Sequence, residues 1–365
     1  MNYKVLARKW RPQSFDQISG QKHIIQAINN SLLINKIHHA WLLYGIRGTG
    51  KTSIARILAK TLNCTNLTNI QACRICNNCI NIENGTFLDL IEVDAASRTK
   101  IEDMKDLLNN IHYAPIKGKY KIYLIDEIHM LSKHSFNALL KNIEEPPDYI
   151  KFIFATTNIE KIPKTIISRC LQFNLKPISE SEICKRIKKI LIQENITFEE
   201  NAIKHIAIFS EGSLRDGLSL TEHAIALGKG NISTNLVYEI TGSISDQLAI
   251  QIVSALLNNN TELIINIFNE MNQNNIEWDQ ILSTILRILH HIAMIQSFPL
   301  MWKNTNINKI HNNILQNLIH TISPITIHKC YQELIIGKKE LKFAPNAKIG
   351  VEMALLRLIN LNKEK

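Results

Sequence analysis

The sequence has no long apolar run, no secretory leader, no repeat of solenoid period and no low-complexity tail. Its longest apolar runs, such as residues 40–44 and 122–125, are far shorter than the roughly 20 residues that span a bilayer. The first segment, MNYKVLARKWRPQSF, is polar and basic and lacks the apolar core of a signal peptide. These absences predict a soluble, cytosolic protein without membrane association, and in that compartment clustered cysteines are more often metal ligands than disulfides.

The composition is that of a globular protein with more than one domain. Single hydrophobic cores stop growing near about 250–300 residues, and the chain has 365 residues, of which 45% are hydrophobic and 20% charged. The formal net charge of +10 and the pI of about 9.2 favour a polyanionic partner such as nucleic acid. Enrichment in isoleucine, asparagine and lysine also follows from AT-biased coding, so charge alone does not decide the partner.

Short apolar runs alternate with helix-period segments through the first half of the chain. The runs that predict strands cover residues 40–45, 88–93, 121–126, 151–157 and 171–175. The segments that predict helices cover residues 52–62, 101–111 and 134–145. Continuous apolar strands separated by helices imply a parallel sheet that is covered on both faces, and therefore an α/β fold.

After Pro177 the pattern becomes helical. Ser179 and Ser181 are candidate caps for a helix to about residue 193, and two further helical segments end near residues 228–231. The later helix-period segments cover residues 246–257, 261–271, 278–296, 326–343 and 350–361. We therefore expect an α/β domain over 1–178, a small helical domain over 179–242 and a larger helical domain over 243–365.

A phosphate-binding loop follows the first predicted strand. GIRGTGKT fits the pattern G-x-x-x-x-G-K-[ST] without a mismatch and precedes a predicted helix. Glycines let backbone amides wrap the phosphates, and the helix N-terminus adds its positive dipole end. Lys51 is expected to neutralise the β- and γ-phosphates, and Thr52 to hold Mg²⁺. The expected nucleotide-binding residues are Gly45, Ile46, Arg47, Gly48, Thr49, Gly50, Lys51 and Thr52.

An acidic pair ends the predicted strand IYLID. Asp126 is expected to contact Mg²⁺, and Glu127 to orient or deprotonate the attacking water. Alone, an Asp–Glu pair after a strand is usually part of a solvated loop. Together with the phosphate loop, the pair predicts hydrolysis of a nucleoside triphosphate.

Two arginines stand at helix ends, where an arginine can have a structural role or contact a phosphate. Arg169, in SRC, lies just before a predicted strand, and its common structural role there is to neutralise a helix C-terminus. Arg215, in GSLRDGL, lies early in a helix, where a cation opposes the helix dipole and a compensating anion is favoured. Spacing alone leaves both roles open.

Four of the seven cysteines lie within seventeen residues, after the phosphate-loop helix. They are Cys64, Cys73, Cys76 and Cys79. Four thiolates suit a closed tetrahedral zinc site of structural character. An iron–sulfur cluster shares the tight triplet but lacks the C-x₃-C-P continuation, and two disulfides are not expected in the cytosol. The isolated Cys170, Cys184 and Cys330 are expected to be small core residues.

The order of these motifs resembles that of AAA+ ATPases of the clamp-loader group. LARKWRPQSFDQISGQ, IHHAWLLYGIRGTGKTSIARILAKTLNC, DAASRTKIEDMKDLL and IDEIHMLSKHSFNALLKNIEEPP look like the bacterial DNA polymerase III gamma/tau family. The likeness is dense through about residue 220 and thinner to the end, where NIEWD, ELKFAP and GVEMALLR carry it.

The resemblance implies roles that spacing cannot give. It implies an AAA+ domain with an inserted zinc module over 64–79, followed by a lid domain and a helical collar that holds an oligomer. It makes Thr157 a polar sensor near the γ-phosphate and Arg215 a second sensor in the same subunit. Arg169 becomes a finger that acts in trans on ATP held by a neighbouring subunit, a contact worth about 10³–10⁵ in rate. The segment RKWRP is placed near the adenine.

The function implied is that of a clamp-loader ATPase, with ATP, Mg²⁺ and Zn²⁺ as cofactors. Such loaders are rings of five subunits, and the resemblance implies that the ring contains copies of this chain. The ring opens a sliding clamp and closes it on primer-template DNA, and the expected location is the cytoplasm near the nucleoid. The chain stops after the predicted collar, so it resembles a short gamma-like form, which puts contacts with the polymerase core and the helicase in doubt. No polymerase active site is recognised. The alternatives are a helicase-type or Holliday-junction AAA+ motor and a scaffold that binds ATP without hydrolysing it.

Overall fold

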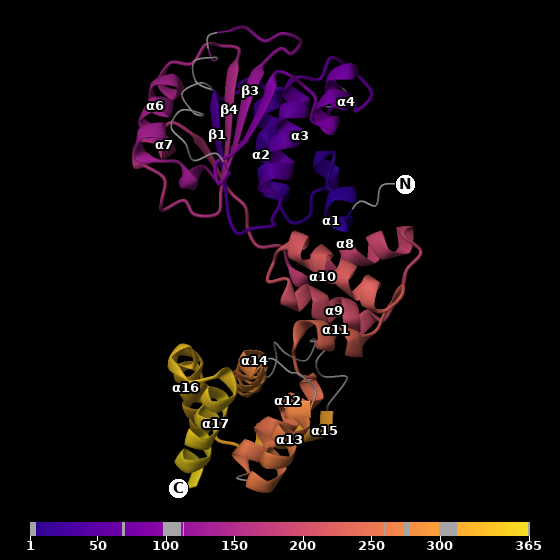
Figure 1. Cartoon of the computed structure of the whole chain (residues 1–365), viewed down its shortest axis with the longest axis vertical. Helices are drawn as coiled ribbons and strands as arrows, with labels where there is room; N and C mark the ends of the chain where they lie inside the picture. Colours follow the sequence, from indigo (N-terminus) through magenta and orange to yellow (C-terminus); the bar gives the residue numbers. More distant parts are fainter. Residues whose placement is uncertain are drawn as a thin grey trace. The chain divides into compact units, whose positions relative to one another are not determined.

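A computed structural model of the chain describes residues 5–67, 70–97, 111, 113–258, 260–273, 278–298 and 312–363. The chain divides into two compact units, Met1–Ser233 and Thr234–Lys365. The first unit contains a sheet with helices around it and then a group of helices, whereas the second is helical (Figure 1). Among the described residues, no helix is long and apolar enough to cross a membrane.

A five-stranded parallel sheet forms the centre of the first unit. Its strand order is β2-β3-β4-β1-β5, and β4 is buried along its whole length. The bounds are Ala40–Tyr44 for β1, Leu90–Asp94 for β2, Lys121–Asp126 for β3, Ile150–Thr156 for β4 and Leu171–Asn174 for β5. The five predicted strands are confirmed within two residues at each end, and so is the parallel arrangement.

Helices cover both faces of this sheet (Figure 1). Alternate residues of β1 show the two faces: Leu42 packs in one buried cluster, and Trp41 and Leu43 pack in the other. The helices are α1 (Leu6–Lys9), η1 (Phe15–Gln17), α2 (Lys22–Leu33), α3 (Lys51–Leu62), α4 (Asn77–Asn84), η3 (Ile128–Met130), α6 (Lys133–Glu144) and α7 (Lys164–Ile167). Helices α2 and α3 cover one face and α6 and α7 the other. The helix predicted over 101–111 lies outside the described residues, except for its last position.

Three helices complete the first unit: α8 (Glu180–Gln193), α9 (Glu200–Phe209) and α10 (Leu214–Leu227). Helix α8 packs on α9, and α10 packs on both. Ser179 caps α8 by accepting a hydrogen bond from the amide of Glu182, as the sequence predicts. A two-stranded parallel sheet of β6 (Thr197–Phe198) and β7 (Asn231–Ile232) was not predicted, because runs of two residues carry no periodicity.

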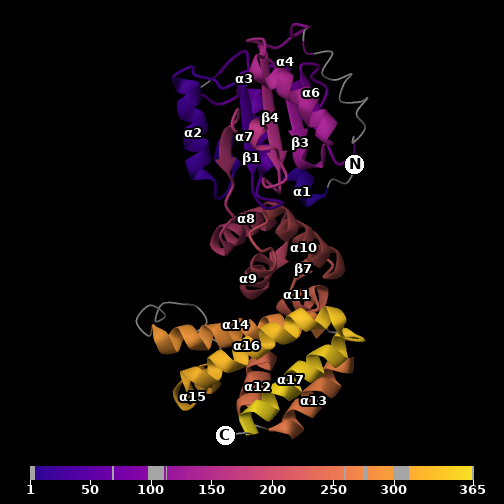
Figure 2. The same ribbon diagram turned by 90° about the vertical axis from the view of Figure 1, so that its left-hand side faces the viewer.

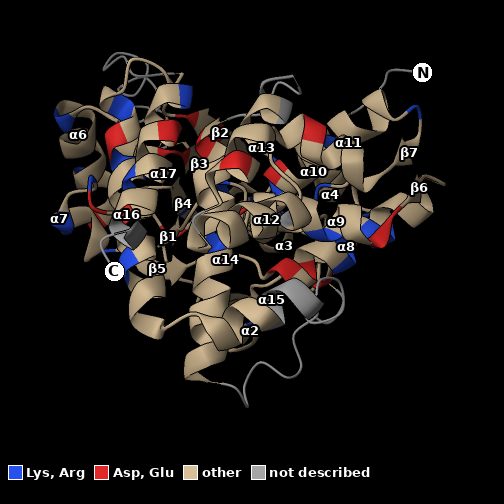
Figure 3. Cartoon of the chain, turned by 90° about the horizontal axis from the view of Figure 1, so that it is seen from below, with Lys and Arg blue, Asp and Glu red and all other residues tan. Residues whose placement is uncertain are grey.

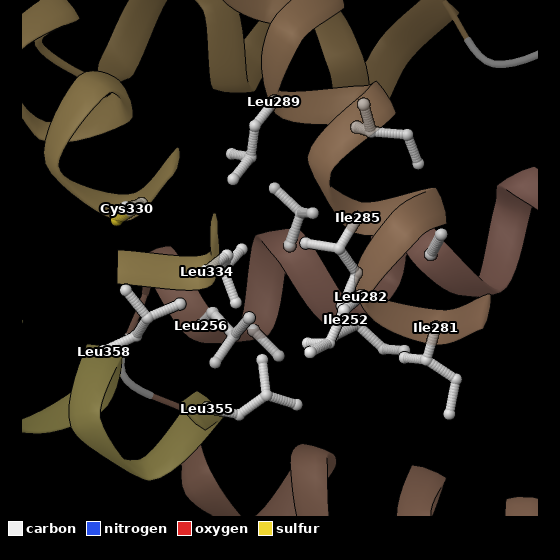
Figure 4. Close-up of a cluster of buried hydrophobic side chains, with 14 of the residues drawn as sticks. Ile252, Leu256, Ile281, Leu282, Ile285, Leu289, Cys330, Leu334, Leu355 and Leu358 are labelled. Atoms are coloured by element: carbon white, nitrogen blue, oxygen red, sulfur yellow. The ribbon is translucent and has the colours of Figure 1, made fainter. Parts of the chain in front are cut away.

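The second unit is a helical bundle around one buried cluster (Figure 4). It contains α11 (Thr234–Thr241), α12 (Asp246–Leu257), α13 (Thr261–Gln273), α14 (Trp278–Ser297), α15 (Asn312–Thr321), α16 (Pro324–Glu340), η5 (Leu341–Phe343) and α17 (Ala347–Lys363). Helices α14 and α16 lie side by side (Figure 2), and Ile285 and Leu334 are both fully buried in the cluster. The helix predicted over 326–343 ends at Glu340, where the chain tightens into η5.

Candidate nucleotide-binding site and cysteine cluster

The predicted phosphate loop connects the end of β1 to the start of α3. Gly45 and Gly48 have φ angles of 147° and 78°, which side-chain-bearing residues rarely adopt. A Cβ at Gly45 would also lie 2.3 Å from the carbonyl oxygen of Leu175. Thr49 closes the loop by donating its hydroxyl to the carbonyl of Ile46 at 2.9 Å. The glycines of the motif are therefore required by backbone conformation and by close packing.

Lys51 lies folded over this loop. Its Nζ donates to the carbonyl oxygens of Gly45 and Ile46, each at 2.9 Å, and the residue is only 6% exposed. Burial lowers the pKa of Lys51, an effect that the neighbouring Glu127 and Asp126 carboxylates partly offset. Lys51 is thus a desolvated cation whose charge an anion beside the loop would stabilise.

Thr52 and Asp126 meet although 74 positions separate them in the sequence. The Thr52 hydroxyl donates to Oδ2 of Asp126 at 2.7 Å, at the point where β3 ends. The sheet accounts for this, because strand β3 ends beside the loop that precedes α3. A hydroxyl and a carboxylate are the oxygen ligands that Mg²⁺ takes in phosphate-loop proteins. The donor set fits the expected metal.

Glu127 is held beside Thr157. Its backbone is left-handed, with φ of 49°, and its Oε2 accepts from both the amide and the hydroxyl of Thr157 at 2.9 Å. The ring nitrogen Nδ1 of His129 lies 3.2 Å from the same oxygen. Sequence reasoning placed Glu127 and Thr157 at the site but did not single out His129, although it follows the acidic pair in DEIHM.

Three arginines gather around the loop in the first unit. Burial lowers the pKa of Arg11, and so do the nearby positive charges of Arg56 and Arg215. Nε of Arg11 lies 3.4 Å from the hydroxyl of Ser53, one residue after the loop. A Cβ at Gly48 would lie 3.1 Å from Cβ of Arg215. The structure therefore brings Arg215 of α10 to the phosphate loop and adds Arg11, which the sequence suggested only through RKWRP.

Arg169 lies apart from these arginines and is tied to other residues. Its Nη2 lies 2.5 Å from Oε1 of Glu144, and its Nη1 donates to the carbonyl of Thr165 at 2.8 Å. The bond to Thr165 is the helix-end interaction that an arginine commonly makes. The side chain is 37% exposed, so a second molecule has access to it.

The four clustered cysteines converge on one point. Their sulfur atoms all lie within 4.8 Å of one another, in a part of the chain that begins after α3 and ends in α4. The amides of Cys73 and Cys76 donate to the sulfurs of Cys64 and Cys73, at 3.3 and 3.4 Å. All seven cysteines of the chain are free, so the disulfide alternative is wrong. Four converging thiols match the ligand set of a structural zinc site.

Some of these thiols ionise easily and others do not. Burial opposes ionisation of Cys76, but hydrogen bonds with Thr65 and with the backbone of Cys79 lower the pKa of Cys76 to about 6. Burial raises the pKa of Cys79. Metal ligands bind as thiolates, so the lowered pKa of Cys76 favours its binding to a metal, whereas Cys79 has to lose its proton on binding.

A polar network joins the cysteine segment to α3. Lys60 is 2% exposed and donates to Gln13 at 2.9 Å and to Glu83 at 3.3 Å. Arg74, between two of the cysteines, pairs with the same Glu83 at 3.5 Å. A cavity of about 20 Å³ beside this network has room for a single water and not for a nucleotide. The network therefore has a structural role next to the nucleotide site.

Comparison with protein-family models divides the chain among three families. The family described as DNA polymerase III, delta subunit, matches residues 20–179. The DNA polymerase III clamp loader subunit, ATPase lid domain, matches residues 182–230. The family described as DNA polymerase III subunits gamma and tau domain III matches residues 232–365.

Relatives with assigned names match over nearly the whole chain. DNA polymerase III subunit gamma of Buchnera aphidicola subsp. Baizongia pistaciae is 53% identical over 99% of this chain and 98% of that protein. DNA polymerase III subunit tau of Escherichia coli K12 is 50% identical over 98% of this chain and 56% of that protein. A solved structure of the Thermotoga maritima RuvB Holliday junction branch migration motor aligns at 22% identity with a TM-score of 0.48, over 68% of this chain and 79% of that chain. On the strength of the sequence relatives, the chain belongs to the gamma/tau subunit family of DNA polymerase III, which are AAA+ ATPases of the clamp loader.

Proposed function

We propose that the chain is the ATP-hydrolysing subunit of a DNA polymerase III clamp loader, which uses ATP to place a sliding clamp on primed DNA. One observation carries the chemistry: the Thr52 hydroxyl is bonded to Asp126, next to a Glu127 that is fixed by Thr157. These residues come from the start of α3 and from the ends of β3 and β4, and they meet beside one phosphate loop. Membership of the gamma/tau family supports the biological setting.

Binding of ATP rests on the loop and its lysine. The loop amides and the α3 N-terminus receive the phosphates, and Lys51 exchanges its bonds with the Gly45 and Ile46 carbonyls for phosphate oxygens. Thr52 and Asp126 hold Mg²⁺, which when bound neutralises charge on the β- and γ-phosphates. Arg215, beside Gly48, reaches the same phosphates from α10. Nucleotide binding thus connects α10 with the sheet.

Hydrolysis requires a base and a stabiliser of negative charge. Glu127 accepts the proton of the attacking water, and Thr157 keeps the carboxylate in place. Arg169 acts on ATP bound by a neighbouring subunit. Its partly exposed side chain, which pairs with Glu144 and not with the phosphate loop of its own subunit, supports this role. A lone subunit lacks this arginine at its site and hydrolyses ATP slowly.

One Zn²⁺ is held by Cys64, Cys73, Cys76 and Cys79. The converging sulfurs support this, and so do the amide–sulfur hydrogen bonds. Four protein ligands leave no open position for a substrate, so the metal stabilises the segment and takes no part in hydrolysis. The ion would stabilise the segment that contains the four cysteines, next to the hydrogen bond by which Lys60 of α3 contacts Glu83 of α4.

The remaining parts have mechanical roles. Residues 1–178 form the nucleotide-binding domain, 179–242 the lid, and 243–365 the collar that holds five subunits in a ring. Primer-template DNA enters this ring, and the net charge of +10 favours its phosphates. Blue and red residues are interspersed among the tan residues of the ribbon in Figure 3, so the net charge alone does not locate the DNA contacts.

The test is ATP hydrolysis by the chain alone and by the chain assembled with the other loader subunits. Rates are measured with and without clamp and primed DNA. We expect slow turnover alone and strong stimulation by the complete set, with Lys51→Ala losing nucleotide binding and Glu127→Gln losing only turnover. If the loader with Glu127→Gln still loaded clamps through repeated cycles, the scaffold alternative would be favoured, because ATP would then regulate the complex without being hydrolysed. Stimulation by four-way junction DNA without a clamp would favour the branch-migration alternative.

A further inference from the structure

One carboxylate oxygen of Glu127 has three polar groups around it, and two of them donate hydrogen bonds to it. Oε2 accepts from the amide and the hydroxyl of Thr157, each at 2.9 Å, and His129 Nδ1 lies 3.2 Å away. Within the described part of the chain no hydrogen bond reaches Oε1. Glu127 is thus anchored through one oxygen, and the other is left for a water molecule.

The hydrogen bonds of the Thr156 hydroxyl favour a proton on one particular ring nitrogen of His129. Thr156 Oγ1 lies 2.9 Å from His129 Nδ1, accepts from the amide of Asn158 at 3.1 Å and lies 3.1 Å from the carbonyl oxygen of Asn158. A hydroxyl has one proton to donate. If it goes to the carbonyl of Asn158, the hydroxyl oxygen accepts from Nδ1–H, and both Thr156 Oγ1 and His129 Nδ1 then have partners. The opposite arrangement turns a bare nitrogen lone pair toward the Glu127 carboxylate, which is unfavourable.

We propose that His129 is a positioning residue for ATP hydrolysis: its Nδ1–H bridges Thr156 and Glu127 and fixes Oε2, so that Oε1 accepts the proton of the attacking water. The inference rests on the proposed role of Glu127 as the base. The His129 side chain is only 10% exposed, so this bond is shielded from water and is stronger than a surface bond. Residue 129 lies in η3, directly after the acidic pair, whereas Thr156 ends β4. His129 therefore links the two strand ends that carry Glu127 and Thr157.

The test compares two substitutions with a control in the assembled loader. His129→Phe keeps a ring of similar size and removes both nitrogens. His129→Asn places an amide N–H near the position of Nδ1. His134→Phe makes the same chemical change on the exposed surface of α6. For each variant, kcat and KM of DNA-stimulated hydrolysis, nucleotide affinity and thermal unfolding are measured.

We expect His129→Phe to lower kcat roughly tenfold, because a hydrogen bond to a charged group is lost. Nucleotide affinity should stay within about twofold, since no proposed phosphate ligand is changed. His129→Asn should recover most of the lost kcat, and His134→Phe should match the wild type. Equal losses of kcat in the Phe and Asn variants, or an unchanged kcat in both, would overturn the proposal.

A spectroscopic measurement keeps the proposal testable if His129→Phe fails to fold. In the wild-type chain labelled with ¹⁵N-histidine, the His129 resonances are identified by their absence from the His129→Asn spectrum. We expect a proton on Nδ1, whereas neutral histidine in water prefers Nε2–H. A bare Nδ1 would contradict the inference even in an active enzyme. Absence of stimulated hydrolysis in the wild-type loader would instead contradict the proposed function. The ¹⁵N-histidine spectrum would still show whether Nδ1 of His129 carries a proton.

Discussion

Gly48 of the phosphate loop lies directly against Ser213, the residue that caps α10. A Cβ built on Gly48 would come within 1.9 Å of the Ser213 hydroxyl oxygen. The same hydroxyl accepts from the amide of Asp216 and so fixes the start of α10. The loop that is proposed to hold the phosphates and the helix that carries Arg215 are therefore in contact, and a shift of one affects the other.

Gly48→Ala is expected to destabilise the chain in the absence of nucleotide. The added Cβ clashes with Ser213, and the left-handed backbone at φ 78° adds roughly 1–2 kcal/mol of its own. Gly50→Ala is the control, because φ there is 105° but a Cβ would meet nothing within 4 Å. Denaturant unfolding should show a larger loss for Gly48→Ala. Equal losses of unfolding free energy in the two variants would mean that Ser213 moves away from the added methyl group without an energetic cost.

Metal analysis of the purified chain should find one Zn²⁺ per molecule. Cys76→Ser should lose the metal and lower the thermal stability, because three remaining thiolates no longer close the site. Cys184→Ser, which removes an isolated thiol on α8, should keep the metal. A folded wild-type chain without metal would refute the zinc assignment, whereas bound iron would favour the cluster alternative.

Glu194 should make stability depend on pH. Its hydrogen bonds with Lys9 and Trp10, at 2.7 Å, lower the pKa of Glu194 in the folded chain. A carboxylate with a lowered folded pKa stabilises the fold above its unfolded value of about 4.3, and this contribution is lost as the pH falls through the folded pKa. Glu194→Gln should therefore cost about 1 kcal/mol of unfolding free energy at pH 7 and little near pH 3.

The matched control is Glu200→Gln, since Glu200 pairs with Lys188 at 2.7 Å but has a side chain that is 71% exposed. Its effect should be smaller than that of Glu194→Gln at neutral pH. A Glu194→Gln variant whose difference from the wild type stayed constant from pH 7 to pH 3 would contradict the ion-pair explanation. The pair also ties RKWRP, which includes Arg11, to the end of α8, and Arg11 contacts Ser53 beside the loop.

The sheet was largely predictable because its central strands β1, β3 and β4 are mostly apolar and buried. The start of β2 was predicted two residues early, at residue 88, and Asp89 gives the physical reason. Its buried carboxylate accepts from the amides of residues 116–118, each at 2.7 Å, so it organises a neighbouring loop instead of beginning a strand. A contact over 27 to 29 positions leaves no local pattern in the sequence.

The candidate site was also predictable only in part, because some of its contacts join residues that are distant in the sequence. The spacing of GIRGTGKT and the acidic pair predicts Lys51, Thr52 and Asp126, because those roles depend on local backbone geometry. The contact of Arg169 with Glu144 spans 25 positions and depends on how α6 and α7 are packed. The bond between Glu127 and Thr157 spans 30 positions and follows from two adjacent strand ends. Sequence patterns therefore identify candidate site residues, whereas contacts between residues that are distant in the sequence depend on how the strands and helices pack.

DNA-stimulated hydrolysis should fall as salt rises. Each phosphate that the loader neutralises releases a counterion, and the logarithm of affinity falls by about 0.7–0.9 per phosphate for each tenfold rise in salt. The half-maximal DNA concentration is measured over a range of salt concentrations, with hydrolysis in the absence of DNA as the control. A DNA dependence that does not change with salt would count against backbone contacts as the source of binding.

We expect the chain to hydrolyse ATP together with an arginine from a neighbouring subunit. The direct measurement is DNA-stimulated hydrolysis by the assembled loader that contains Arg169→Ala, alongside nucleotide affinity and Glu144→Gln. We expect unchanged ATP affinity and loss of most stimulated turnover, by about 10³-fold or more if every active site depends on this arginine. Glu144→Gln, which removes the carboxylate that pairs with Arg169, should retain turnover. Normal stimulated hydrolysis in the Arg169→Ala loader would rule out Arg169 as the arginine that acts on a neighbouring subunit's ATP.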